Sequence, residues 1–236
     1  MDTSESDASY AWLPSMLQTV DPLFPIGSYA HSYGFEELAA IARFEGGHDL
    51  LEFLRSIVRL NLAQFELPYL RFACESLLEG DADGIVQIDR EIGAAKLSSE
   101  VRRASEAQGR QRLRLLRELH PDTRFEALAK LAESGEVGPH HITVFAAERV
   151  QQNSPLRATL ISWAYQSFAA PCAASLKIMR IGQNAAQSAL TEALSWTPDI
   201  VAESLHVERE WAGVFNPVID IAADRHERAY ARLFIS

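Results

Sequence analysis

A short segment that combines histidine, glycine and aromatic residues is the first place in this chain where chemistry is conceivable. Residues 25–37 read PIGSYAHSYGFEE, so His31 lies beside two serines and is followed by Glu36 and Glu37. A serine or histidine could act in nucleophilic catalysis only if an acid oriented the imidazole, and adjacency in sequence does not establish that geometry. Three interpretations follow: a catalytic loop, a metal site, or a surface for another protein.

The histidine spacing does not favour a metal centre. His140 and His141 are adjacent, so on a helix their side chains point about 100° apart and do not chelate one ion together. The segment 45–48 is a Glu-x-x-His pair, but glycines fill its middle, whereas a di-iron bundle needs such pairs on long core helices. No HExxH, P-loop, GxSxG or GxGxxG motif is present. We therefore predict no catalytic residues and no tightly bound metal or cofactor. The competing hypothesis is an all-α metalloenzyme that uses His31, Glu36 and His226.

Composition and charge narrow the class of protein. The chain has 236 residues, and 47% of them are hydrophobic, which is enough apolar material for a core. Its net charge is −10, and this acidic balance argues against a nucleic-acid-binding protein. Residues 1–10 are acidic and polar, which predicts a disordered tail and no secretion signal. The two cysteines form no CxxC motif and are expected to be buried thiols. We expect a cytoplasmic protein.

Helical periodicity dominates the chain and predicts an all-α fold of about eight to ten helices in one domain, residues 11–236. Pro68 is expected to kink a helix or begin one, and β-branched residues 141–146 are expected to be helical because a lone strand has no partner. Pairs of a capping residue and proline predict three helix starts, at Ser154-Pro155, Thr197-Pro198 and Asn216-Pro217.

One uncharged segment, residues 158–176, is nearly long enough to span a bilayer. Alanine and serine dominate it and Pro171 interrupts it, so we interpret it as a buried central helix with close-packing small residues and predict no membrane contact. Its packing surface is larger than one domain needs, and this predicts a homodimer.

Two further segments have the character of interaction surfaces. A predicted helix over residues 102–117 holds six arginines, which form either a solvated face or a docking face for an acidic partner. The C-terminal HERAYARLFIS places Leu233 and Phe234 within three residues of the end of the chain. Such an apolar end is either part of the chain's own core or an anchor for a partner.

Four blocks of the sequence, taken in order, resemble the UreF family of urease accessory proteins. The blocks are MLQTVDPLFPIGSYAHSYGFEE (residues 16–37), GPHH (residues 138–141), RIGQ (residues 180–183) with Gln187, and the end of the chain from Pro217. In the first block the residues that hold the pattern are Asp21, Pro25, Gly27, Ala30, His31, Ser32, Gly34 and Glu36. In the last block they are Pro217, Asp220, Ile221, Ala222, His226, Glu227, Tyr230, Arg232, Leu233, Phe234 and Ser236.

The resemblance implies a non-catalytic, all-helical homodimer that binds UreD (also called UreH), recruits the GTPase UreG, and helps to deliver nickel to apo-urease. Nickel would then be in transit rather than a resident cofactor. The resemblance also implies that the turn at residues 25–36 is an interaction and folding element, and that six C-terminal residues contact the partner: His226, Tyr230, Arg232, Leu233, Phe234 and Ser236. An unrelated helical adaptor is the remaining alternative.

Overall fold

The chain folds as a set of α-helices around one continuous hydrophobic core in this computed structural model, which describes residues 10–27, 32, 34–229 and 232–234. Helices occupy 76% of the structure, and the described residues contain eleven continuous helices and no strand. The all-α prediction is confirmed, and the number of helices is slightly above the eight to ten expected. The predicted tail, residues 1–10, lies outside the described residues except for Tyr10.

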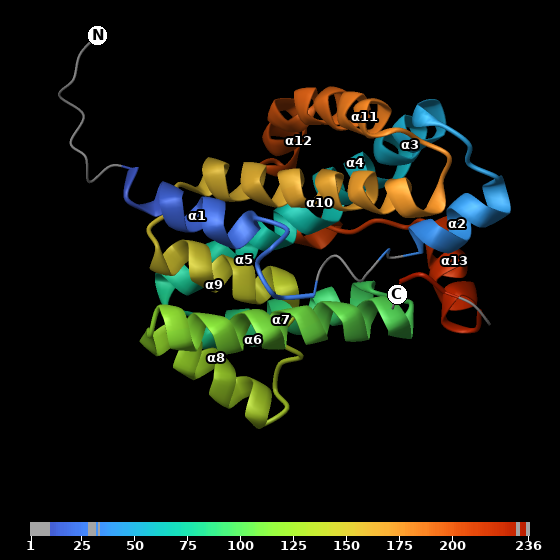
Figure 1. Cartoon of the computed structure of the whole chain (residues 1–236). Coiled ribbons are helices and arrows are strands. Elements are labelled where there is room, and N and C mark those ends of the chain that lie inside the picture. The colour runs from blue at the N-terminus through green and yellow to red at the C-terminus, as the bar shows by residue number, and fades with distance from the viewer. Residues whose placement is uncertain (1–9, 28–31, 33, 230–231, 235–236) are drawn as a thin grey trace, which may run out of the picture.

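The first half of the chain supplies six of these helices, drawn from blue to green in Figure 1. They are α1 (Trp12–Val20), α2 (Phe35–Ala42), a long helix from Gly47 to Glu79, α6 (Ala82–Ala95), α7 (Ser99–Leu119) and α8 (Thr123–Glu133). The second half supplies α9 (His141–Gln151), α10 (Leu156–Ile178), α11 (Gln183–Ser195), α12 (Thr197–Ser204) and α13 (Pro217–Glu227), with a short 3₁₀ turn at Arg209–Trp211.

The long helix from Gly47 to Glu79 changes its winding twice. It comprises α3 (Gly47–Phe53), a π segment (Leu54–Val58), α4 (Arg59–Asn61), a second π segment (Leu62–Glu66) and α5 (Leu67–Glu79). Pro68 lies just after the second π segment, and because proline has no N–H the carbonyl of Gln64 loses its helical donor. Gly213 N donates to that carbonyl at 2.8 Å instead. As the second residue of α5, the proline lies where the continuous helix returns from π to α winding, and it leaves a carbonyl that holds the segment before α13.

The central helix of the fold is α9, which packs between α5 and α7. Every residue from Ile142 to Val150 is buried, so residues 141–146 are helical as predicted. The expectation that residues 158–176 form the buried central helix is wrong. In α10 the side chains of Ile161, Tyr165 and Leu176 are exposed, although the helix packs on α5, α11 and α12. Within the described part of the chain no helix is both long and apolar enough to cross a membrane.

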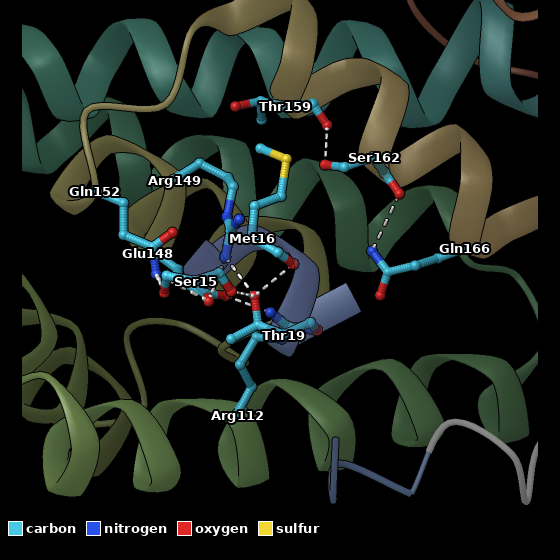
Figure 2. A network of polar contacts seen from close by, with 10 residues as sticks. All are labelled: Ser15, Met16, Thr19, Arg112, Glu148, Arg149, Gln152, Thr159, Ser162 and Gln166. Atoms are coloured by element: carbon cyan, nitrogen blue, oxygen red, sulfur yellow. Dashed lines mark hydrogen bonds and ion pairs between the residues drawn. The ribbon is translucent and has the colours of Figure 1, made fainter. Parts of the chain in front are cut away.

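A buried ionic cluster fixes α1 onto α7 and α9 (Figure 2). The carboxylate of Glu148 accepts hydrogen bonds from the guanidinium groups of Arg112 and Arg149, and all three side chains are fully buried. Arg112 also donates to the carbonyl of Thr19 at 2.9 Å, and Arg149 donates to the Thr19 hydroxyl. Burial by itself favours the neutral acid, but the two arginines hold the pKa of Glu148 below its usual range.

This cluster changes the interpretation of the arginine-rich helix. Arg112 lies in the core, and other arginines of α7 are paired within the chain: Arg103 with Glu227, Arg110 with Glu106, and Arg117 with Glu126. Most of these guanidinium groups therefore stabilise the chain's own helices. Cys74 and Cys172 are free and buried as expected, and burial raises the pKa of each thiol to about 12.

Candidate partner-binding site

The glycine-containing turn before α2 brings the chain into close contact with α13. Gly34 has φ +84°, in the region that favours glycine. A Cβ at this position would lie 3.1 Å from both the Ala223 nitrogen and the Ile219 oxygen. Gly34 is therefore needed both for its backbone conformation and for the space that it leaves to α13.

The start of the same turn is attached to α7. The side-chain amide of Gln111 donates to the carbonyl of Pro25 at 3.1 Å, and Gly27 also has a positive φ, +81°. Ser32 is buried, and its carbonyl accepts a hydrogen bond from Phe35 N at 2.9 Å. The predicted residues Pro25, Gly27, Ser32, Gly34 and Glu36 are all described, whereas His31 lies outside the described residues.

Glu36, in the first turn of α2, binds the C-terminal tail. One of its carboxylate oxygens accepts a hydrogen bond from Leu233 N at 2.9 Å. The other accepts from Phe234 N at 3.1 Å and lies 3.0 Å from Nε2 of His226. Two segments that lie at opposite ends of the sequence therefore meet on one carboxylate.

Glu100, in the first turn of α7, completes the clamp. It is buried, and its two oxygens lie 3.1 Å from Nδ1 of His226 and 2.9 Å from Nη1 of Arg232. Carboxylates only accept hydrogen bonds, so both His226 nitrogens donate at once when the ring is an imidazolium. In that form the two acids are balanced by His226 and Arg232, and each partner is held by charge-assisted hydrogen bonds. We call Glu36, Glu100, His226 and Arg232 the tail clamp.

Further ion pairs surround the clamp and connect the same helices. Arg225 of α13 donates to Glu37 of α2 at 3.0 Å, and Ser99 of α7 donates to Glu227 of α13 at 2.8 Å. The hydrogen bond from Arg103 holds the pKa of Glu227 below its usual range. α2, α7 and α13 are thus connected by side chains around the tail.

The tail presents its two apolar side chains in opposite ways. Phe234 is 5% exposed, belongs to the core, and has the Lys177 ammonium 5.2 Å from its ring centroid. Leu233 is 67% exposed. Of the two interpretations of this apolar end, Phe234 therefore fits the chain's own core, and the clamp holds its backbone nitrogen together with that of Leu233. Tyr230 and Ser236 lie outside the described residues.

Among the described residues, the side chains are not arranged as the metalloenzyme hypothesis requires. Glu36 and His226 do meet, but both imidazole nitrogens of His226 already face carboxylate oxygens. In the part of the chain that the structure describes, no group of three or more His, Cys, Asp or Glu side chains is arranged to hold a metal ion. The arrangement holds a peptide backbone, and it offers no nucleophile at the clamp.

An apolar surface that the sequence interpretation missed lies on and before α13. Trp211, Phe215, Val218 and Ile221 are all exposed. Val218 and Ile221 are three residues apart and so share a helix face, while Ala222, Ala223 and His226 bury the opposite face. Val218 and Ile221 thus form an exposed apolar stripe on α13, and stripes of this kind mark interaction surfaces. The signal was present in the sequence, in the run of apolar residues between Trp211 and Ile221.

Comparison with known proteins agrees with the pattern of sequence blocks. The family model UreF matches residues 45–194, more than half of the chain. A protein from Paenarthrobacter aurescens (strain TC1), named urease accessory protein UreF, is 28% identical over 94% of this chain and 97% of its own length. A protein of the same name from Dechloromonas aromatica (strain RCB) is 29% identical over 95% of this chain and 97% of its own length. Another, from Haemophilus influenzae (strain ATCC 51907 / DSM 11121 / KW20 / Rd), is 26% identical over 95% of this chain and 95% of its own length.

These relatives match 94–95% of this chain, and their printed names describe an accessory protein rather than an enzyme. The chain belongs to the UreF family of urease accessory proteins.

Proposed function

We propose that this chain is a non-catalytic scaffold in urease maturation that joins UreD (UreH) and the GTPase UreG, so that the nickel site of apo-urease can be filled. The observation that carries the proposal is the tail clamp. It holds the last described residues in a fixed conformation with Leu233 turned outward, and a pre-ordered anchor binds at a lower entropic cost than a free tail.

The proposed UreD-facing surface consists of Leu233 together with the exposed apolar residues Trp211, Phe215, Val218 and Ile221. Nickel passes through the assembly in this proposal and is not a tightly held cofactor of the isolated chain. The proposed site of action is the cytoplasm, where an apo-enzyme would be matured before use.

Reconstitution of urease activation tests this function. We expect that urease co-expressed with its accessory proteins and this chain becomes active, and that UreD co-purifies with the tagged chain. Without the chain, activation should fall at least tenfold, since no other component would connect UreD with UreG. Full activation in its absence would contradict the scaffold role, as would a stoichiometric metal in the purified chain together with turnover of its own.

We also propose that the chain forms a homodimer through the exposed stripe of α10. Ile161, Tyr165, Ala173 and Leu176 are exposed on this helix and carry no charge. Because alanine lets a second backbone approach closely, this surface suits a symmetric contact with another copy of the chain.

Light scattering is expected to give twice the chain mass of 26.2 kDa at micromolar concentration, with no partner present. Ile161→Asp combined with Tyr165→Asp should shift the species toward 26.2 kDa, because the carboxylates would be desolvated at the contact. The matched control is Leu60→Asp, on another exposed helix surface, and it should leave the dimer intact. A wild-type chain that stays at the single mass contradicts the dimer.

A further inference from the structure

Residues 207–216 connect α12 with α13 (Figure 1), and we call them the strap. The only helical part of the strap is the short 3₁₀ turn Arg209–Trp211. A connecting segment with so little regular structure is ordinarily more mobile than the helices that it joins. The strap is different because contacts with the long helix and with α6 fix it at three points.

Two of these attachment points hold the backbone of the strap. Nη2 of Arg71, on α5, donates a hydrogen bond to the carbonyl of Val207 at 2.6 Å. Gly213 N donates at 2.8 Å to the carbonyl of Gln64, which Pro68 leaves without a helical donor. One contact lies before the 3₁₀ turn and the other lies after it. The turn is therefore held at both ends against the long helix.

The third attachment point is a side chain within the turn. The guanidinium of Arg209 donates two hydrogen bonds to the carboxylate of Glu91 on α6, at 3.0 and 2.9 Å. A bidentate pair of this kind fixes the relative orientation of the two groups as well as their distance. The hydroxyl of Tyr69 donates to the same carboxylate at 3.3 Å. Burial and the charge of Glu91 raise the pKa of Tyr69 to about 12, so the hydroxyl keeps its proton at neutral pH.

The strap turns two aromatic side chains outward. Ala212 and Val214 pack against the hydrophobic core, whereas Trp211 is 73% exposed and Phe215 is 79% exposed. Tryptophan is enriched among the few residues that supply most of the binding energy of an interface. Because the backbone on both sides of Trp211 is already attached, little of its conformational freedom remains to be lost on binding. Trp211 is therefore presented as a preformed binding group.

The charges beside Trp211 indicate what kind of surface it would meet. Glu208 and Glu210 are exposed, and neither forms an ion pair with any residue that the structure describes. Arg209, the single basic residue of the strap, is neutralised by Glu91. The strap thus carries uncompensated negative charge, so an acidic surface would be repelled and a basic one attracted.

We propose that Trp211 is the anchor of the contact with UreD, and that it enters an apolar pocket of that partner whose rim carries lysine or arginine side chains. This inference rests on the proposed function and adds which residue dominates the docking surface and what the partner presents to it. A projecting indole leaves water only in a concave, apolar site. Cations at the rim of that site would face Glu208 and Glu210 and would speed association. Arg209 and Glu91 are positioning residues, since they act through Trp211.

The affinity of the full chain for purified UreD, measured by biolayer interferometry, tests the anchor. Trp211→Ala is expected to weaken binding at least about tenfold and to leave the melting temperature unchanged, because the side chain is exposed. The matched control is Leu119→Ala, an exposed apolar residue at the end of α7, which should change neither. Glu208→Gln combined with Glu210→Gln should slow association at low salt, and this difference should disappear at about 1 M salt, where charges are screened.

The positioning role is measured separately, with variants that keep Trp211. Arg209→Glu breaks the pair with Glu91, so it should speed hydrogen exchange of the Gly213 amide and weaken the binding of UreD at least about threefold. Adding Glu91→Arg to this variant rebuilds the pair in reverse and should restore both the protection of the amide and the affinity. If Arg209→Glu releases the Gly213 amide but binds UreD as tightly as the wild type, the strap does not act by presenting Trp211.

The results also separate this inference from the function on which it rests. If Trp211→Ala binds UreD like the wild type while Leu233→Asp does not, the anchor is overturned and the scaffold function stands. An association rate that the paired glutamine substitutions leave unchanged at low salt overturns the basic rim. A wild-type chain that does not bind UreD contradicts the proposed function, and this inference falls with it.

Discussion

Glu148→Gln is expected to lower the free energy of unfolding by about 3–5 kcal/mol, the range observed when one partner of a buried ion pair is removed. The substitution keeps the shape of the side chain but leaves the guanidinium groups of Arg112 and Arg149 in the core without a counter-ion. Both arginines also bond to Thr19, so α1 should detach early. Urea denaturation, monitored by circular dichroism, measures the change.

The pH dependence of this variant has a definite sign. The folded-state pKa of Glu148 is below its usual range, so its contribution is fully present above the pKa of an unfolded glutamate, about 4.3. The contribution is lost as the pH falls through the lower folded-state pKa. The stability difference between wild type and Glu148→Gln should therefore be largest near neutral pH and shrink in acid.

A matched control is available in Glu126→Gln. Glu126 also pairs with an arginine, Arg117, through two hydrogen bonds of 2.8 Å, but that pair lies at the surface. Exposed pairs contribute little because water and salt screen them. If Glu148→Gln destabilised the chain no more than Glu126→Gln does, the buried cluster would not be what holds α1 in place.

This cluster also marks where sequence reasoning reached its limit. Residues 158–176 carry no charge and were expected to be the central helix, whereas α9 contains Glu148 and Arg149 and is the helix that is buried throughout. A charge count fails here because Glu148 pairs with both Arg149 and Arg112 inside the core, so charged side chains of α9 are buried together with their partners. The signal that was available is the position of Glu148 and Arg149 within the apolar run of α9.

The helix starts were predicted with more success than their caps. Prolines placed the first residues of α10, α12 and α13 to within one residue. None of these three helices has a side-chain hydrogen bond at its N-cap, although Ser154, Thr197 and Asn216 were expected to supply one. The fixed φ of proline is sufficient to set the entry of the chain, so the capping side chain is dispensable.

The sequence predicted most residues of the candidate site but did not predict which of them contact one another. The blocks that resemble UreF include Glu36, His226 and Arg232, yet 190 positions separate Glu36 from His226. A local sequence pattern does not indicate which residues make contact when they are this far apart along the chain. Glu100, which completes the clamp, belongs to no block of the resemblance, and its only local feature is a position in the first turn of α7.

Leu233→Asp is expected to lower the capture of UreD at least tenfold while it leaves the helical fold and its melting temperature intact. This prediction rests on the proposed scaffold function. Burying a leucine in a partner stabilises the complex by about 1.5–3 kcal/mol, and 1.4 kcal/mol corresponds to a tenfold change in affinity. The chain's own fold loses little, since Leu233 is exposed and the clamp binds its backbone nitrogen rather than its side chain.

Phe234→Ala should have the opposite signature. Phe234 is buried in the chain's own core, so its truncation is expected to reduce stability by about 1.5–3 kcal/mol, and to weaken UreD capture only through loss of the tail's conformation. Deletion of residues 232–236 removes both side chains and the clamp contacts of Arg232, so it should lower the melting temperature as well as the capture of UreD.

The control for the charge that Leu233→Asp adds is Leu78→Asp, a change at an equally exposed leucine on α5, and it should leave the capture of UreD unchanged. If Leu233→Asp retains full capture of UreD and full urease activation, the tail serves the chain's own fold alone, and the docking surface lies elsewhere.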